Sequence, residues 1–129
     1  MDLWRGEYSG RLPRINRKYG ARCIGGKGRA YVTSEYRLGT EDMAAAFSGM
    51  QAPIEAPVNA YIEVSMWSRI DSDAPIKAIF DALGKAGVVR DDKQIRDFAV
   101  LRKFHKRDEA DHVTVVLVEE SEPIAEMPE

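Results

Sequence analysis

The sequence contains very few of the residues from which disulfides and soft-metal sites are built. Among its 129 residues there is one cysteine, Cys23, and there are two histidines, His105 and His112. A single cysteine excludes an intrachain disulfide and any zinc site that takes several cysteines from one chain. The histidines are not spaced like metal-binding pairs such as those of Glu-x-x-His motifs, so we expect both to be surface or hairpin residues rather than ligands.

Long apolar runs are absent as well. No segment approaches the roughly 20 apolar residues that a helix needs to cross a bilayer, and residues 1–6 lack the apolar core of a signal peptide. We therefore expect a cytoplasmic protein. With 44% hydrophobic and 31% charged side chains, the chain is typical of one globular domain, residues 1–129. Its end, from about residue 120 to residue 129, has the composition of an acidic, flexible tail.

Charge is distributed unevenly along the chain. The net charge of −2 argues against a nucleic-acid partner, because proteins that neutralise phosphates usually carry an excess of Lys and Arg. Residues 1–37, however, hold nine basic and three acidic side chains, a balance of +6, which leaves −8 on the remainder. This asymmetry permits a basic binding surface beside an acidic site, although on charge alone a merely solvated segment is equally favoured. The candidates for contact with DNA are Arg14, Arg17, Lys18, Lys27, Arg29 and, further along, Arg69.

The first third of the chain predicts short strands followed by a helix. Up to about residue 37, glycine, proline and aromatic residues are interspersed as in short strands joined by turns, with a hairpin turn at Gly25–Gly28. This glycine cluster lacks the spacing of a phosphate-binding loop. An alanine-rich run that begins at Ser34 or Thr40 and extends to about Met50 predicts a helix, which Pro53 ends.

The remainder predicts a strand, a helix and two further strands. Alternating apolar residues indicate a strand over Val58–Trp67. A helix should then begin at Asp71 or Asp73, carry an apolar stripe and end at Gly87. Strands over Ile95–Phe104 and His112–Glu119 should pair as a hairpin. The expected fold is α+β, with a mixed or antiparallel sheet of about four strands covered by two main helices.

Acidic residues at two places carry the candidate chemistry. Asp71 and Asp73 lie where a strand gives way to a helix, so in extended geometry their carboxylates project to one side of the chain. Asp91 and Asp92 follow one helix later, and the return of that helix can carry an acid back toward the first pair if helix and strand lengths match. Clustered carboxylates repel one another, so they favour a hard divalent cation, and magnesium prefers such oxygen ligands together with substrate phosphates.

Such an ion would serve phosphodiester hydrolysis by polarising the phosphoryl group, helping to form a hydroxide and neutralising the leaving oxygen. Lys77, four residues after Asp73 on the same helix face, could stabilise charge on the phosphate. A plainer interpretation stays open, because aspartates at helix starts are usually caps and a helix lysine is usually solvated or paired with a neighbour such as Asp81.

The segment from Arg69 to Ile95 resembles the signature of the RusA family of Holliday-junction resolvases. That family typically shows Asp-x-Asp-Asn, a lysine four residues after the second Asp, Phe/Leu-Asp-Ala-Leu, a glycine, and Asp-Asp-x-Gln before a strand. This sequence has Asp71-Ser72-Asp73, Lys77, Phe80-Asp81-Ala82-Leu83, Gly87 and Asp91-Asp92-Lys93-Gln94. It departs from the pattern at Ala74, where the family has an asparagine whose amide could support the site.

The resemblance implies a catalytic site of Asp71, Asp73, Asp92 and Lys77, in which the three aspartates hold the metal. Asp91 would be a further ligand, orient Asp92, or cap the local turn. The cofactor would be Mg²⁺, with Mn²⁺ as an alternative. The family further implies a homodimer that cuts four-way DNA junctions by paired nicks in recombination, repair or phage DNA processing.

Two other functions are compatible with these residues. One is a junction- or DNA-binding protein whose site is degenerate, which would bind branched DNA without cutting it. The other is a structural α+β subunit whose aspartates are caps and whose basic face meets a protein. Only the second predicts no salt-dependent affinity for DNA.

Overall fold

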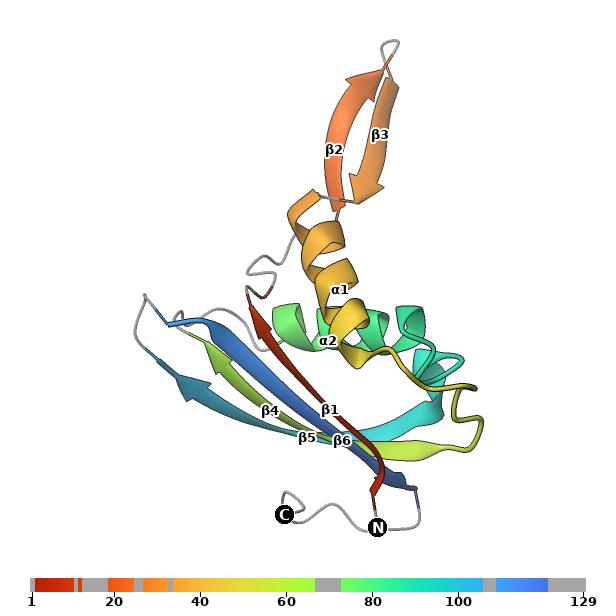
Figure 1. Ribbon diagram of the computed structural model, residues 1–129. Helices are drawn as coiled ribbons and strands as arrows, with labels where there is room; N and C mark the ends of the chain where they lie inside the picture. The colour runs from red at the N-terminus through yellow and green to blue at the C-terminus, as the bar shows by residue number, and fades with distance from the viewer. Residues whose placement is uncertain are drawn as a thin grey trace.

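The computed structural model describes residues 2–10, 12, 19–24, 27–32, 34–66, 73–105 and 109–120, with backbone alone for 19–24, 27–32, 34–35 and 73–74. Its elements are β1 (Asp2–Gly10), β2 (Tyr19–Ile24), β3 (Lys27–Val32), α1 (Ser34–Phe47), β4 (Val58–Met66), α2 (Asp73–Lys85), the 3-10 helix η1 (Asp92–Gln94), β5 (Ile95–Phe104) and β6 (Asp111–Glu119). A four-stranded mixed sheet lies beneath α1 and α2 (Figure 1). The expected α+β fold is confirmed.

The strands of this sheet follow the order β1-β6-β4-β5. β6 is antiparallel to both β1 and β4, whereas β4 and β5 are parallel, with Val58 beside Ile95 and Met66 beside Phe104. The expected pairing of β5 with β6 as a hairpin is therefore wrong, because β4 lies between them. β4 and β6 are both buried over most of their length, so burial favours the two inner positions of the sheet for them. α2 supplies the crossover that a parallel neighbour of β4 needs.

The core is the layer between the sheet and the helices. Alternate residues of β4, Ile62 and Val64 among them, are fully buried against apolar side chains of α2 such as Ile79 and Leu83. The opposite face of the sheet has a small buried cluster of its own, in which Tyr61 of β4 packs with two valines of β6. Because each fully buried aliphatic side chain contributes about 1.5–3 kcal/mol, the sheet–helix layer dominates the stability of the fold.

The second helix begins and ends where its sequence indicates. α2 starts at Asp73 and carries Pro75 in its first turn, where a missing N–H costs nothing. Beyond its end, Gly87 has a φ of 74°, which glycine tolerates, and the N–H of Val88 donates to the carbonyl of Leu83 at 3.0 Å. The predicted glycine cap is thus confirmed, and it turns the chain back toward β5.

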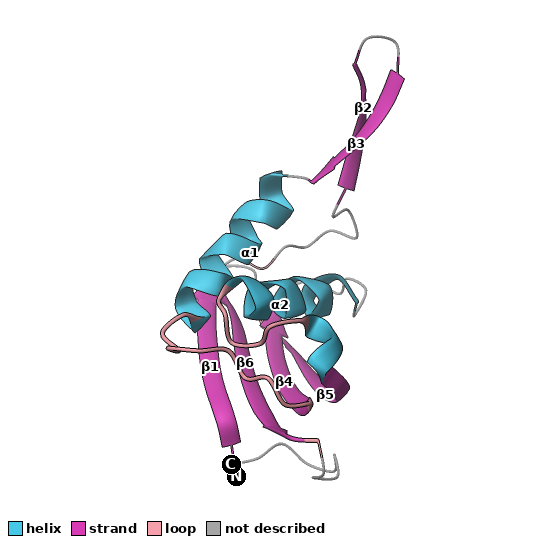
Figure 2. Cartoon of the chain, turned by 90° about the vertical axis from the view of Figure 1, so that its right-hand side faces the viewer, coloured by secondary structure: helices cyan, strands magenta, loops and turns pink. Residues whose placement is uncertain are grey.

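In the first third of the chain, α1 and the β2–β3 hairpin also agree with the prediction. α1 begins at Ser34 and ends at Phe47, and its Tyr36 hydroxyl donates to the carboxylate of Asp81 on α2. The β2–β3 pair is an antiparallel hairpin whose register brackets the predicted glycine turn. Figures 1 and 2 show that this hairpin projects away from the sheet beyond the start of α1.

Candidate functional site

Of the two predicted acids near α2, the structure describes Asp73, which lies after β4 at the start of the helix. Asp73 is the first residue of α2, and the backbone alone describes it, while Asp71 lies outside the described residues. Lys77 is one turn further along the helix and is exposed to solvent, so its ammonium is available to a ligand. The position of Asp73 at a helix start agrees both with a capping role and with a carboxylate presented to solvent.

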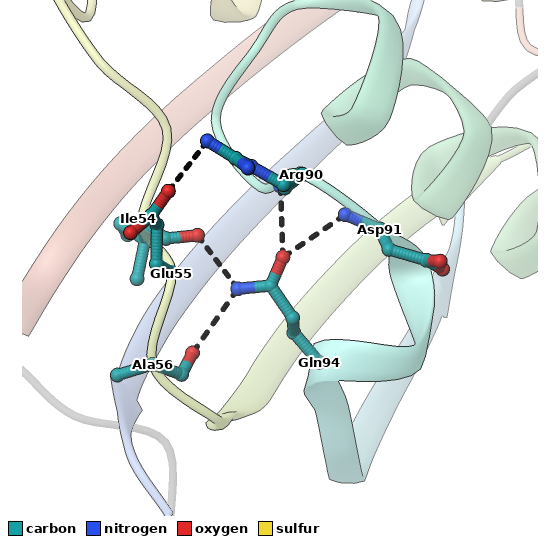
Figure 3. Close-up of polar contacts among 6 residues, drawn as sticks. All are labelled: Ile54, Glu55, Ala56, Arg90, Asp91 and Gln94. Atoms are coloured by element: carbon teal, nitrogen blue, oxygen red, sulfur yellow. Dashed lines mark hydrogen bonds and ion pairs between the residues drawn. The ribbon is translucent and has the colours of Figure 1, made fainter.

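The other predicted acids stand on a turn that Gln94 holds in place (Figure 3). The side-chain oxygen of Gln94, Oε1, accepts from the backbone N–H groups of Arg90 and Asp91, both at 2.9 Å. Its amide nitrogen donates to the carbonyls of Ile54 and Ala56, at 2.6 and 3.2 Å. One neutral side chain therefore joins the turn after α2 to the segment that leads into β4.

This Gln94 contact was not singled out by sequence reasoning, although a signal for it exists. Asp91 is the N-cap of η1: its Oδ1 accepts from the N–H of Lys93 at 3.0 Å, and Gln94 reaches back to the Asp91 N–H. Asp-x-x-Gln is a variant of the capping box, in which cap and third residue satisfy each other's backbone donors. These contacts support the capping role predicted for Asp91.

The two adjacent carboxylates influence each other strongly. The pKa of Asp92 is raised, first by a hydrogen bond with the Asp91 side chain, then by partial burial and by the negative charges of Asp91 and Asp81. The pKa of Asp91 is lowered, first by the Lys93 N–H and then by the same hydrogen bond with Asp92. Protonation of Asp92 would offset this charge repulsion, and a cation placed there would do the same.

Within one chain, Asp73 and Asp92 lie at opposite ends of α2. Asp92 lies close enough to Asp81, two helical turns after Asp73, for the Asp81 charge to raise its pKa. Asp92 is the first residue of η1, which directly precedes Ile95, and Ile95 pairs with the start of β4. α2, in contrast, follows the end of β4. α2 rises by about 18 Å over its length and β4 spans about 26 Å, so the helix does not bring the Asp92 turn back to Asp73.

The donor set of the Asp91–Asp92 turn fits a hard divalent cation. It consists of carboxylate oxygens that are exposed, crowded and close to a third acid, Asp81. Among the side chains that the structure describes, no group of three or more His, Cys, Asp and Glu is gathered as in a metal site. Asp71 and the side chain of Asp73 lie outside that set, so the predicted three-aspartate site stays a prediction.

Most of the basic candidates fall outside the described residues, namely Arg14, Arg17, Lys18 and Arg69. Lys27 and Arg29 belong to β3, where the backbone alone is described. Because the β2–β3 hairpin projects away from the sheet (Figure 1), these two positions are carried on an extension that could reach along a bound duplex. Their contact with DNA stays a prediction.

One expectation about the histidines is wrong. His105, which follows β5, is not a surface residue: its side chain is 8% exposed, and its Nε2 lies 3.0 Å from Oδ1 of Asp111. Its position in the sequence predicted a polar turn, but the ring contacts the buried carboxylate at the start of β6. His112 is half-buried on β6, where its Nδ1 lies 2.8 Å from the hydroxyl of Ser9 on β1.

Comparison with known families supports the motif analysis. The family described as "Endodeoxyribonuclease RusA" matches residues 13–117, which include all the predicted site residues. No curated protein matches the chain. Within the described ranges, neither helix combines the length and the apolar character needed to cross a membrane.

Proposed function

This chain belongs to the RusA family of endodeoxyribonucleases, and from that premise we propose that it resolves Holliday junctions by metal-dependent, paired nicks. The observation that carries the proposal is the family match over residues 13–117, which contains Asp-x-Asp at 71–73 and Asp-Asp-x-Gln at 91–94. Its context would be DNA recombination, repair or phage DNA processing, with the whole chain acting as one domain.

We assign the roles within this site as follows. Asp71, Asp73 and Asp92 would hold a divalent cation, Mg²⁺ or Mn²⁺, which when bound would polarise the scissile phosphate and favour formation of a hydroxide. Lys77, exposed one turn into α2, would stabilise the charge that develops on the phosphate oxygens. Asp91 would hold the turn that presents Asp92, because it caps η1. The absent family asparagine, Ala74 here, removes one side-chain amide from this arrangement.

We further propose that the acids come together between the two subunits of a homodimer. In one chain, the Asp92 turn stands beside the start of β4 and Asp73 stands beyond its end. An antiparallel β5–β5 contact across a twofold axis would place the start of one β5 beside the end of the other. Asp92 of one subunit would then lie at the end of the sheet that carries Asp71 and Asp73 of its partner.

The character of β5 supports this edge as the dimer contact. Among the strands that the structure describes, β5 pairs on one side only, with β4. Three large apolar side chains on this ten-residue strand are half-exposed: Phe98 by 44%, Leu101 by 49% and Phe104 by 50%. A long edge strand with exposed apolar residues is a template for pairing with another chain, and a second copy would cover it.

Mixed dimers test the enzyme and the composite site together. Asp73→Asn and Asp92→Asn variants are each expected to lose junction nicking in the presence of Mg²⁺, with EDTA as the control for metal dependence. Mixing the two variants should restore about a quarter of wild-type nicking, because half of randomly formed dimers are mixed and each has one complete site of two. Sites contained within single chains would give no recovery.

The same assay separates the alternatives. Wild-type protein that nicks a four-way junction in symmetric positions, in preference to a linear duplex, supports the resolvase. Tight, salt-sensitive junction binding without nicking would instead indicate a degenerate binding protein. Neither binding nor nicking would contradict both and leave the structural subunit.

A further inference from the structure

A buried hydrogen bond between a histidine and a carboxylate, His105 and Asp111, lies at the end of the sheet where β4 and β5 finish. Asp111 is the first residue of β6, and its side chain is 0% exposed. Oδ1 of this carboxylate accepts from Nε2 of His105, at 3.0 Å. Oδ2 accepts from the backbone N–H of Leu12, also at 3.0 Å, although Leu12 lies 99 residues away in the sequence.

Both partners of Asp111 lie where the chain leaves the sheet toward predicted functional residues. Leu12 is fully buried two residues after the end of β1, and it directly precedes the segment 13–18 with three basic candidates. The backbone N–H of His105 donates to the carbonyl of Met66 at 3.0 Å. Met66 is the last residue of β4, and residues 67–72 lead from it to the first two acids.

The charge of Asp111 lies in apolar surroundings. Burial raises the pKa of Tyr8, and the negative charges of Asp42 and Asp111 raise it further. Tyr8 and Leu12 both belong to the main buried cluster. A buried hydrogen-bonded pair gives up its contacts with water, and replacing both partners by apolar side chains of similar shape is often nearly neutral for stability. The contribution that an apolar pair could not reproduce is a defined acceptor for the Leu12 N–H.

We propose that the Asp111–His105 pair is a positioning device that sets where residues 13–18 and residues 67–72 leave the sheet. By holding Leu12 and the end of β4 to one carboxylate, it would fix the relative positions of the two residues from which the basic segment and the segment with Asp71 continue. Neither residue touches the reacting atoms in this proposal. The inference rests on the proposed function, because its consequence is measured on junction DNA.

The test compares His105→Ala with His105→Gln, which keeps an N–H donor at similar reach. Three quantities are measured for the full-length protein: amide hydrogen exchange at Leu12, junction affinity and its salt dependence in EDTA, and nicking at saturating enzyme with Mg²⁺. Circular dichroism and thermal melting verify that each variant is folded at the assay temperature. If His105→Ala does not fold, the apolar double variant Asp111→Leu with His105→Leu takes its place.

For the alanine variant we expect faster exchange at Leu12, affinity weaker by about tenfold with a shallower salt slope, and nicking slower by about tenfold. The glutamine variant should recover each quantity to within about threefold of wild type. A merely structural pair would lower the melting temperature but leave affinity, salt slope and nicking of folded protein unchanged, and this result would overturn the inference. Unchanged exchange at Leu12 would overturn it too.

Failure of the proposed function is distinguishable from failure of this inference. Wild-type protein that binds junctions without nicking them would contradict the resolvase, while exchange and affinity would still decide the positioning role. Wild-type protein that does not bind DNA would overturn both.

Discussion

The carboxylates at the two ends of the central sheet differ in exposure and in structural role. Where β5 begins, Asp91 and Asp92 are exposed, and the turn beneath them is held mainly by the neutral amide of Gln94. Where β5 ends, Asp111 is fully buried and itself holds the chain, through His105 and Leu12. The difference indicates that an acid can be left available for a ligand only where another group provides the structural hydrogen bonds.

Removing the Asp92 carboxylate should have the largest effect of all on activity and almost none on stability. We expect Asp92→Asn to lower junction nicking by about a hundred-fold or more, since the proposed site takes a metal-binding oxygen from this carboxylate. The melting temperature should be unchanged or slightly higher, because the substitution relieves repulsion from Asp91 and Asp81. Asp97→Asn, at an exposed acid on β5 just after η1, is the matched control and should retain nicking.

At the other end of the sheet, stability should be the affected property. Asp111→Leu removes the acceptor of the Leu12 N–H and the partner of His105, and we expect a loss of about 3 kcal/mol in the free energy of unfolding. Urea denaturation monitored by circular dichroism measures it. A loss below about 1 kcal/mol would show that this end is held by packing instead.

Gln94 should affect both nicking activity and stability, because it holds the turn that carries Asp91 and Asp92. Gln94→Ala removes hydrogen bonds to two N–H groups and two carbonyls, so we expect a loss of about 2 kcal/mol in stability. Nicking should fall by about tenfold even where the protein is folded, as for residues that orient metal ligands. Lys93→Ala, at the exposed residue beside it, is the control.

The exposed ion pair near the Asp91–Asp92 turn should matter least. Arg90 and Glu55 approach to 2.5 Å, but their side chains are 70% and 67% exposed. Because water and salt screen such pairs, Arg90→Ala should cost no more than about 0.5 kcal/mol. A cost comparable to that of Asp111→Leu would contradict the contrast between an exposed ion pair and a buried hydrogen-bonded carboxylate.

Much of the local structure was predictable, and the failures share one cause. The apolar stripe of α2, its glycine cap and the alternation of β4 are patterns within single segments, and each is confirmed. The predicted pairing of β5 with β6 is wrong because strands that are neighbours in the sequence need not be neighbours in the sheet. His105 was misjudged for the same reason: its partner and its burial depend on how β6 and the end of β1 come together.

By itself, the sequence determined the spacing of the acids, the elements that carry them and membership of the family, since these are properties of neighbouring residues. Only the tertiary structure decided that β4 lies between β5 and β6, that one chain holds Asp73 and Asp92 at opposite ends of α2, and that Asp111 is buried. The physical reason is that strand order and burial are set by contacts between segments far apart in the chain, which compete to cover the apolar faces of β4.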